Sequence, residues 1–366
     1  MSDKPSVAVG LSGGVDSSVA AALLVQAGYR VSGLTMRIWD GPETGQPGCR
    51  QGCYGPGEEE DVAACEALCS RLGIPYTVVD LSREYERTVL EYFRTEYLRG
   101  RTPNPCVLCT HVMKFGFLLD RARIEGLRFD LFATGHYARV QERNGRPCLR
   151  TAADPSKDQS YFLHRLKPEV LGKVLFPLGE KTKPEVRDIA RSLGLEVAEK
   201  PESQDFVSGG DYSSVFSGRD SPPGDIVDTE GRVLGRHRGI HLYTIGQRRG
   251  LGVSSGPDPL YVLRLDPDRN QVVVGPGEGL FSEGLEAEDA VLSAPSLEDV
   301  PFECRVRIRQ NHAPAAARVT VRKGSARVLF RTPQRAVAPG QSAVFYDEAG
   351  FVLGGGVIEK ALPREE

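Results

Sequence analysis

Residues 7–18 read VAVGLSGGVDSS, and the fold of the first half of the chain can be worked out from this run. The apolar residues 7–11 predict a buried strand, and residues 15–29 predict a helix with Val19, Leu23 and Leu24 on one face. A glycine-rich turn between a strand and a helix is where an α/β sheet binds anions, because the amides and the dipole of the helix N-terminus attract negative charge. We therefore expect a phosphate site at residues 10–17.

The side chains of this loop refine the expectation. Gly13 and Gly14 allow close approach of the backbone, and Ser12 and Ser17 add hydroxyl groups. The loop contains no lysine, so it is not the GxxxxGK[ST] loop, whose lysine binds the terminal phosphates. Asp16 would repel a phosphate unless a Mg²⁺ ion bridges the two groups.

The order of strand-like and helical segments along the chain predicts three domains. Strand-like and helical segments alternate up to about residue 200, which favours a doubly wound parallel sheet, and Asn144-Gly145 predicts a hairpin turn. We expect strands over 30–39, 76–81 and 131–138, and helices over 58–72, 82–98, 114–126 and 184–193. Short alternating segments beyond residue 280 favour a small β-barrel. The predicted domains are an α/β domain over 1–200, a small central domain over 201–279 and a C-terminal β-barrel over 280–366.

Composition excludes several classes of protein. The 366 residues are 40% hydrophobic and 26% charged, which is typical of a globular protein and not of a disordered chain. No apolar run is long enough to span a membrane, and the N-terminus has no signal-peptide pattern, so we expect a cytoplasmic protein.

The charge is unevenly distributed. The net charge is −3, yet residues 301–340 hold nine Lys and Arg against one acid, while residues 283–299 hold six acids and no base. The basic segment is either a footprint for a polyanion or a set of solvated strand faces.

The most informative cysteines lie in residues 100–109, which read GRTPNPCVLC. The two prolines end the preceding helix and place Cys106 and Cys109 at the start of the next one, where the helix dipole favours a thiolate. A thiolate there can act as a nucleophile, a metal ligand or a persulfide carrier, and half of a structural zinc site is the alternative.

The other cysteines have different surroundings. Cys65 and Cys69 lie on the apolar face of a predicted helix and are interpreted as core residues, and Cys148 and Cys304 as packing residues in strands. Cys53 precedes that helix in a glycine- and proline-rich loop, together with Cys49. It is the better candidate for a functional partner of the CxxC pair.

Together, the two main motifs make the chain resemble the tRNA-specific 2-thiouridylases, PP-loop ATP pyrophosphatases that place sulfur on C2 of the wobble uridine of tRNA. The resemblance covers essentially the whole chain. It rests on GLSGGVDSS (10–18), TMR (35–37), GRTPNPCVLC (100–109), KFG (114–116), ATGHY (133–137), KDQSYF (157–162), HLYTIGQRRGLG (241–252), RVRIR (305–309) and PGQS (339–342).

The resemblance implies three sets of site residues. Cys109 and Cys106 would be catalytic. The ATP site would comprise Gly10, Leu11, Ser12, Gly13, Gly14, Val15, Asp16, Ser17, Met36 and Gly135. The residues that meet tRNA would be Asn104, Pro105, His136, Lys157, Asp158, Gln159, Arg309, Gln310 and Gln341.

The chain departs from the family pattern at one position. Relatives carry a second catalytic cysteine in the stretch that matches residues 201–210, whereas this chain has no cysteine from 149 to 303. Two routes for sulfur remain open. On the first route, Cys106 and Cys109 themselves act as the two catalytic cysteines. On the second, they hold a [4Fe-4S] cluster with Cys53 as third ligand.

The implied cofactors are ATP and Mg²⁺, with the cluster on the second route. The implied partners are a tRNA with a wobble uridine and a sulfur donor, either a cysteine desulfurase or a sulfur carrier, and no membrane. Two alternative functions remain: a PP-loop ligase that adenylates a small metabolite, and a non-catalytic tRNA-binding protein.

Overall fold

The computed structural model describes residues 4–41, 52–200, 205–207, 212–216, 221–253 and 258–363. Two compact units make up the chain, residues 1–89 with 106–212 and residues 90–105 with 213–366. Among the described helices, none has both the length and the apolar character needed to cross a bilayer.

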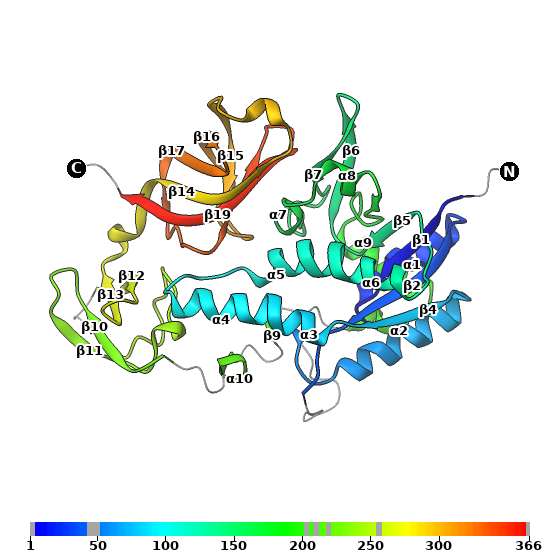
Figure 1. Cartoon of the computed structure of the whole chain (residues 1–366), viewed down its shortest axis with the longest axis horizontal. Coiled ribbons are helices and arrows are strands. Elements are labelled where there is room, and N and C mark those ends of the chain that lie inside the picture. Colours follow the sequence, from blue (N-terminus) through cyan, green and yellow to red (C-terminus); the bar gives the residue numbers. More distant parts are fainter. Residues whose placement is uncertain are drawn as a thin grey trace. The chain divides into compact units, whose positions relative to one another are not determined.

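A five-stranded parallel sheet forms the centre of the first unit (Figure 1). Its strands, in spatial order, are β4 (Tyr76–Asp80), β2 (Arg30–Arg37), β1 (Ser6–Gly10), β5 (Leu131–Thr134) and β8 (Val174–Leu175). The chain leaves β1 toward β2 on one side and later returns to β5 on the other. The carboxyl ends of β1 and β5 therefore form the switch point at which such sheets bind ligands.

Both faces of this sheet are covered. Val7 and Val9 point to a core shared with α1 (Val15–Gln26), α2 (Glu58–Leu72) and α9 (Lys183–Ser192). On the opposite face, Phe132 of β5 packs edge-on against Phe115, with ring centroids 5.3 Å apart. Phe115 belongs to a long helical segment made of α5 (Pro105–Leu108), the π-helical η2 (Cys109–Phe117) and α6 (Leu118–Ile124).

Two small sheets complete the strands of the first unit. β3 (Gly52–Tyr54) pairs in parallel with β9 (Asp205–Val207). β6 (Ala138–Arg143) and β7 (Arg146–Thr151) form the predicted hairpin, with φ of 53° at Asn144 and 71° at Gly145. The short helical elements of this unit are α3 (Ser82–Tyr85), η1 (Glu86–Leu90, whose last residue belongs to the second unit), α7 (Ser160–Leu163), α8 (Pro168–Leu171) and η3 (Glu196–Glu199).

The second unit contains a four-stranded sheet and a closed barrel. The sheet has the order β11 (Val233–His237), β10 (Gly224–Val227), β13 (Gln271–Gly275) and β12 (Tyr261–Asp266). Helix α4 (Glu91–Leu98), helix α10 (Ser213–Phe216) and the short turns η5 (Ile240–Leu242), η6 (Gly277–Leu280) and η7 (Pro295–Leu297) belong to the same unit.

The barrel closes in the order β14-β17-β16-β15-β18-β19 around a core that includes Val306, Val319, Val328 and Phe345. The strands are β14 (Phe281–Leu292), β15 (Phe302–Arg307), β16 (Ala315–Arg322), β17 (Ser325–Arg335), β18 (Ser342–Tyr346) and β19 (Val352–Pro363). Strand β14, which lies largely within the acidic segment, was not predicted because bulges shift its register, as between Ser282 and Gly284, and interrupt the alternation of buried residues.

The predicted fold class is confirmed, with a doubly wound parallel sheet, a small central sheet and a C-terminal barrel. Cys65 and Cys69, each 1% exposed, and Cys304, 5% exposed, are core residues as predicted. The domain boundaries at residues 200 and 279 stay a prediction.

Candidate active site

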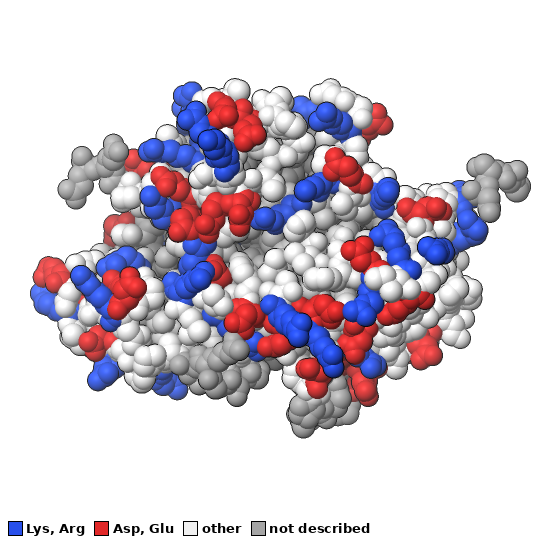
Figure 2. Space-filling model, viewed as in Figure 1, with Lys and Arg blue, Asp and Glu red and all other residues white. Residues whose placement is uncertain are grey.

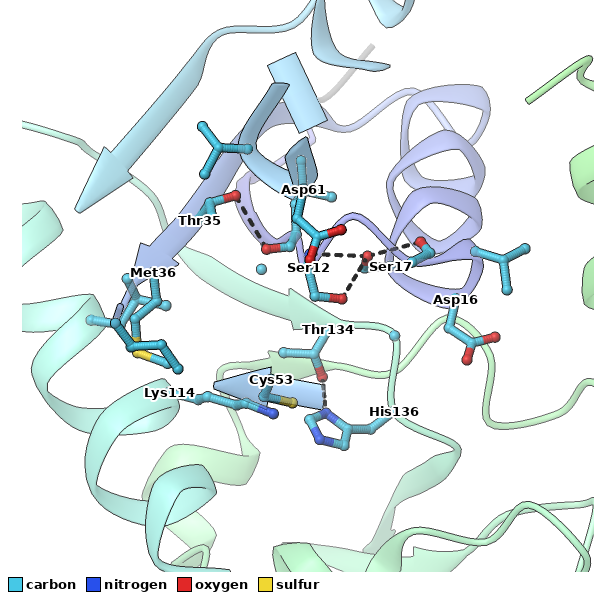
Figure 3. A pocket seen from close by; sticks show the side chains of 18 of the residues that line it. Ser12, Asp16, Ser17, Thr35, Met36, Cys53, Asp61, Lys114, Thr134 and His136 are labelled. Atoms are coloured by element: carbon cyan, nitrogen blue, oxygen red, sulfur yellow. Dashed lines mark hydrogen bonds between the residues drawn. The ribbon is translucent and has the colours of Figure 1, made fainter. Parts of the chain in front are cut away.

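A cavity of about 350 Å³ lies at the switch point, and all of its lining residues belong to the first unit. The predicted ATP-site residues gather here from three elements: the loop after β1, the end of β2 and the turn after β5 (Figure 3). They are Gly10, Leu11, Ser12, Gly14, Val15, Asp16, Ser17, Met36 and Gly135. Gly13 adjoins the cavity through its neighbours in the same loop.

Close contacts and backbone geometry explain two of the glycines. A Cβ atom at Gly135 would lie 2.7 Å from both the carbonyl carbon of Asp16 and the amide nitrogen of Ser17, so only glycine lets the turn after β5 approach the start of α1. Gly13 has φ of 69°, and a Cβ there would lie 2.6 Å from the Asp61 carboxylate.

Hydrogen bonds within the loop hold its shape. The Ser12 amide donates to Ser17 Oγ at 3.2 Å, and the hydroxyl groups of Ser17 and Ser18 donate to the Gly14 carbonyl at 3.2 and 2.9 Å. The Gly13 amide donates to the Cys65 sulfur at 3.1 Å. The loop is therefore shaped before any ligand arrives.

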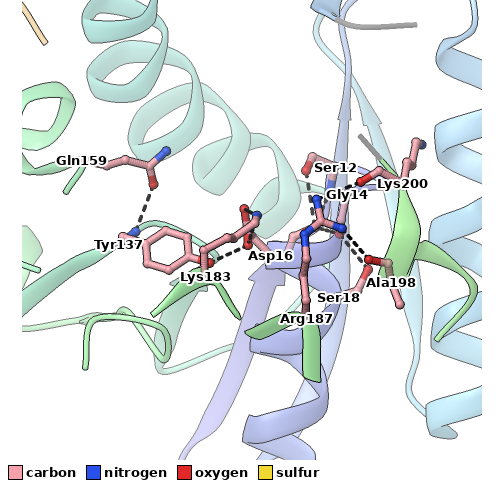
Figure 4. A network of polar contacts seen from close by, with 11 residues as sticks. Ser12, Gly14, Asp16, Ser18, Tyr137, Gln159, Lys183, Arg187, Ala198 and Lys200 are labelled. Carbon is pink, nitrogen blue, oxygen red and sulfur yellow. Dashed lines mark hydrogen bonds and ion pairs between the residues drawn. The ribbon is translucent and has the colours of Figure 1, made fainter. Parts of the chain in front are cut away.

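Asp16 is held by partners that the sequence analysis did not anticipate. Lys183 Nζ lies 2.7 and 2.8 Å from its two carboxylate oxygens, and the Tyr137 hydroxyl donates to it at 2.8 Å (Figure 4). An ammonium group therefore balances this carboxylate in the structure, and a Mg²⁺ bridge between Asp16 and a bound phosphate stays a prediction.

A second lysine lies on the other side of the loop. Lys200 Nζ is 2.6 Å from Asp61 Oδ1 and 3.1 Å from the Gly13 carbonyl oxygen, and Lys183 and Lys200 flank the start of α1 (Figure 4). Together with Lys114, three ammonium groups line the cavity. The loop has no lysine of its own, and these lysines come from distant parts of the chain.

One sequence signal pointed toward Lys183. Thr182 and Glu185 form a capping box that fixes the first turn of α9, and Lys183 is the first residue of that helix. The motif predicts where the helix begins, but the direction of the lysine side chain depends on how α9 packs against α1.

His136 lies beside the same cavity in a polar but poorly solvated position. Its Nδ1 atom is 2.7 Å from Thr134 Oγ1. Burial, and then the positive charge of Lys114, lowers the pKa of His136 from 6.5 to about 3. The imidazole is therefore neutral at physiological pH.

Cys106 and Cys109 lie in the helical segment that begins at Pro105. Cys109 is 9% exposed, and burial raises the pKa of its thiol from 9.0 to about 11, although the charge of Lys114 opposes the shift. The expectation that the helix dipole favours a thiolate is not met at Cys109, because burial has the largest effect on the pKa of its thiol and raises it.

Cys53 is exposed and lines the cavity from β3. The charges of Cys53, Cys106 and Cys109 all raise the pKa of Lys114 and that of Tyr85, so the three thiols lie in the same region of the first unit. Within the described residues, however, no three His, Cys, Asp or Glu side chains converge as a metal-binding group. The described thiols thus do not fit a preformed cluster site. Cys49 lies outside the described residues.

The predicted tRNA contacts in the first unit have different environments. Gln159 lines the cavity, and its Oε1 accepts the Tyr137 amide at 3.0 Å. Asp158 is 2% exposed and accepts hydrogen bonds from the Ala152 amide and the Ser160 hydroxyl, at 3.0 and 2.9 Å. Its carboxylate thus has a structural role, whereas Lys157 is partly exposed.

The other predicted tRNA contacts lie in the second unit. The Gln341 amide donates to the carbonyl oxygens of Thr102 and Pro103 at 3.0 and 3.2 Å, which ties the segment before the CxxC pair, with Asn104 and Pro105, to the barrel. Arg309 donates to the Ala336 carbonyl at 2.6 Å, and Gln310 follows it just beyond β15.

The basic segment of the barrel is partly balanced by acids. Arg322 pairs with Asp299 at 2.7 Å, Arg331 with Glu303 at 2.8 Å and Arg305 with Glu348 at 3.0 Å. Figure 2 shows Lys and Arg interspersed with Asp and Glu on the face that it displays. β15 ends at Arg307, so Arg309 does not continue the strand alternation of Arg305 and Arg307.

Comparison with known proteins covers nearly the whole chain. The family model described as tRNA methyl transferase HUP domain matches residues 5–208. The tRNA methyl transferase PRC-barrel domain matches 217–276, and the aminomethyltransferase beta-barrel domain matches 282–358. A tRNA-specific 2-thiouridylase MnmA from Chloroflexus aggregans is 48% identical over 364 residues, which are 97% of this chain and 98% of that protein.

The chain belongs to the tRNA-specific 2-thiouridylase family. Another member of this 2-thiouridylase family, from Pelobacter propionicus, is 46% identical over 98% of this chain and 99% of its own length. These relatives favour neither the metabolite ligase nor the non-catalytic tRNA-binding protein. The U34-tRNA thiolase NcsA from Methanococcus maripaludis, solved with its [4Fe-4S] cluster, has 21% identity and a TM-score of 0.35, and covers 59% of this chain and 65% of that one. Likeness at that level says nothing about the sulfur chemistry of this chain.

Proposed function

We propose that this chain uses ATP to replace the C2 oxygen of the wobble uridine of tRNA with sulfur. The observation that carries the proposal is the cavity at the ends of β1 and β5, where the loop 10–17 meets three lysine side chains in a chain of the 2-thiouridylase family. A preshaped loop with converging positive charge suits a triphosphate.

In the proposed reaction, the C2 oxygen of uridine attacks the α-phosphate of ATP, and pyrophosphate leaves. Sulfur then attacks C2, and AMP leaves. Activation is needed because a carbonyl oxygen is a very poor leaving group, whereas AMP is a good one. The amides of the loop and the ammonium groups of Lys183 and Lys200 would stabilise charge on the phosphates.

ATP binding would exchange the partners of these lysines. Lys183 and Lys200 each pair with a carboxylate in the structure. A triphosphate carries more charge than Asp16 or Asp61 and would compete for both ammonium groups. Asp16, whose side chain is 33% exposed, would then be available to hold Mg²⁺, and the ion would neutralise charge on the departing pyrophosphate.

The substrate and donor follow from this chemistry. The wobble base must leave its stack in the anticodon loop to reach a cavity of this kind. We propose Asn104, Pro105, His136, Lys157, Gln159, Arg309, Gln310 and Gln341 as residues that meet tRNA, and Asp158 as a residue that shapes the adjacent loop. The sulfur would come from a cysteine desulfurase or a sulfur carrier, in the cytoplasm, where these partners and tRNA occur together.

The arrangement of the thiols favours a route that uses cysteines alone. The described thiols do not converge as a metal site, so a [4Fe-4S] cluster has no part in the proposed reaction. Cys109 remains the proposed catalytic thiol, with Cys106 one turn before it on the same helical segment.

An exchange assay tests the adenylation step. The protein is incubated with ATP, Mg²⁺ and labelled pyrophosphate, with and without tRNA that carries an unmodified wobble uridine. Exchange that requires the tRNA supports the proposal. Exchange that instead requires a small metabolite would indicate a ligase, and no exchange under any condition would indicate a non-catalytic protein.

A further inference from the structure

Cys53 occupies a defined place at the cavity. It lies in β3, between two residues that pair in parallel with β9: Gly52 pairs with Asp205, and Tyr54 pairs with Val207. The Tyr54 ring stacks on Tyr85, with centroids 5.5 Å apart and an angle of 16° between the rings. These contacts hold the cysteine at the edge of the cavity that also contains the phosphate loop.

The groups facing Cys53 suit transfer of an anionic sulfur. Figure 3 shows its sulfur pointing toward the ammonium group of Lys114 and the ring of His136. The ammonium group places positive charge where a persulfide anion and the phosphate of an adenylated base would meet. The neutral imidazole of His136 adds no competing charge.

Cys53 and Cys109 differ in access. Cys53 is exposed, while Cys109 is 9% exposed and enclosed within a helical segment. A sulfur-donor protein must reach the first acceptor thiol, so the exposed cysteine suits loading and the enclosed cysteine suits a later step. Both thiols lie near Lys114 and Tyr85.

We propose that Cys53 receives the sulfur atom and delivers it to the activated uridine, and that Cys109 then releases the thiolated base. This inference rests on the proposed function and assigns the sulfur carrier within the same site. It makes Cys53 a catalytic residue that the CxxC motif alone does not indicate.

Atoms and electrons balance over the whole cycle. The Cys53 thiolate attacks the outer sulfur of the donor persulfide, so that Cys53 becomes a persulfide and the donor leaves as a thiolate. The terminal sulfur then attacks C2 of the adenylated uridine, a C–S bond forms, and the C–O bond to AMP breaks. The Cys109 thiol attacks Cys53 Sγ, a Cys53–Cys109 disulfide forms, and the base sulfur takes both the electron pair of the broken S–S bond and the proton of the Cys109 thiol. A dithiol reductant supplies two electrons and two protons to restore the thiols.

The first measurement is sulfur loading of the full-length protein. The protein is exposed to glutathione persulfide labelled with ³⁵S in its outer sulfur, and labelled peptides are mapped by mass spectrometry. We expect label on Cys53, loss of that label in Cys53→Ser, and normal label in Cys148→Ser, a partly exposed control in the β6–β7 hairpin. Label that is lost in Cys49→Ser or Cys109→Ser and retained in Cys53→Ser would overturn the proposal.

The second measurement separates this inference from the proposed function. Cys53→Ser is expected to lose thiolation down to the background of Cys109→Ser, and tRNA-dependent pyrophosphate release in each variant reports the adenylation step separately. After one turnover without reductant, non-reducing peptide maps should contain the Cys53–Cys109 disulfide. Wild-type thiolation by Cys53→Ser, or thiolation that disappears with iron removal and returns with iron and sulfide, would overturn the thiol route while leaving adenylation intact.

Discussion

Lys183 and Asp16 form an ion pair with Nζ–O distances of 2.7 and 2.8 Å, although they are 167 residues apart in the chain. The Lys183 side chain is 9% exposed and that of Asp16 33% exposed. The pair joins the start of α9 to the start of α1, and it sets the charge of the phosphate loop when no ligand is bound.

Replacing Lys183 should weaken ATP binding. In Lys183→Met, the phosphates lose one charge-assisted contact, which is worth about 1.5–3 kcal/mol or roughly a 10- to 100-fold rise in Kd. Calorimetric titration with ATP measures the change. Lys181→Met is the control, since Lys181 lies two residues earlier and does not line the cavity. Equal affinity in both variants would remove Lys183 from the ATP site.

Asp16 should matter for chemistry more than for folding. Asp16→Ala is expected to abolish tRNA-dependent pyrophosphate exchange while tRNA binding stays nearly intact, because the carboxylate holds Mg²⁺ in the proposed reaction. Asp16→Asn keeps an acceptor for the Tyr137 hydroxyl but loses the charge, so it should be equally inactive and better folded. Normal exchange in Asp16→Asn would contradict this role.

The first unit should lose stability in mild acid. Burial, as the largest cause, lowers the pKa of both His136 and His164 from 6.5 to about 3. Between pH 3 and 6.5, each histidine binds fewer protons in the folded chain than in the unfolded chain. Its contribution to the free energy of unfolding is therefore complete above pH 6.5 and is lost as the pH falls from 6.5 toward 3. The loss amounts to at most about 1.4 kcal/mol per pH unit for each histidine.

Urea unfolding followed by tryptophan fluorescence measures this effect, because Trp39, the single tryptophan, lies in the first unit. His164→Asn should be less stable at neutral pH, since it alters the contact of Nδ1 with the Tyr161 carbonyl, but its stability should change less between pH 4.5 and 6.5. An unchanged pH slope in this variant would show that His164 is not held neutral.

The barrel arginines should govern the salt dependence of tRNA binding. Removing both Arg305 and Arg307, which point outward from β15, should weaken binding and flatten the plot of log K against log salt by about one unit for each lost phosphate contact. Arg264→Ala, on the four-stranded sheet, is the matched control. If the double variant keeps the wild-type slope, the tRNA footprint lies elsewhere.

The sequence patterns predicted the elements that carry strong local signals. The loop 10–17, the hairpin at Asn144-Gly145 and the helix over 58–72 all depend on neighbouring residues, and the structure contains them. β14 was missed because its bulges leave the consecutive residues Gly284 and Leu285 both buried, which interrupts the apolar alternation.

The site was predictable only in part, because local sequence signals do not show which distant residues packing brings together. The glycines and serines of the loop are contiguous and follow a strand, so their clustering could be foreseen. Lys183 and Lys200 reach the loop only through packing of the segments that carry them, and no local motif marks their direction. Likewise, the protonation of Cys109 depends on how deeply its thiol is buried, which the position of the cysteine in the sequence does not show.

The most direct test of the proposed function is the product itself. Purified full-length protein is incubated with ATP, Mg²⁺, a persulfide donor, a dithiol reductant and unmodified tRNA with a wobble uridine, and the tRNA nucleosides are analysed by mass spectrometry. We predict 2-thiouridine at the wobble position, formed only when ATP is present and absent with Cys109→Ser. Wobble uridine that remains unthiolated with every component present, or thiolation that proceeds without ATP, would contradict the proposed function.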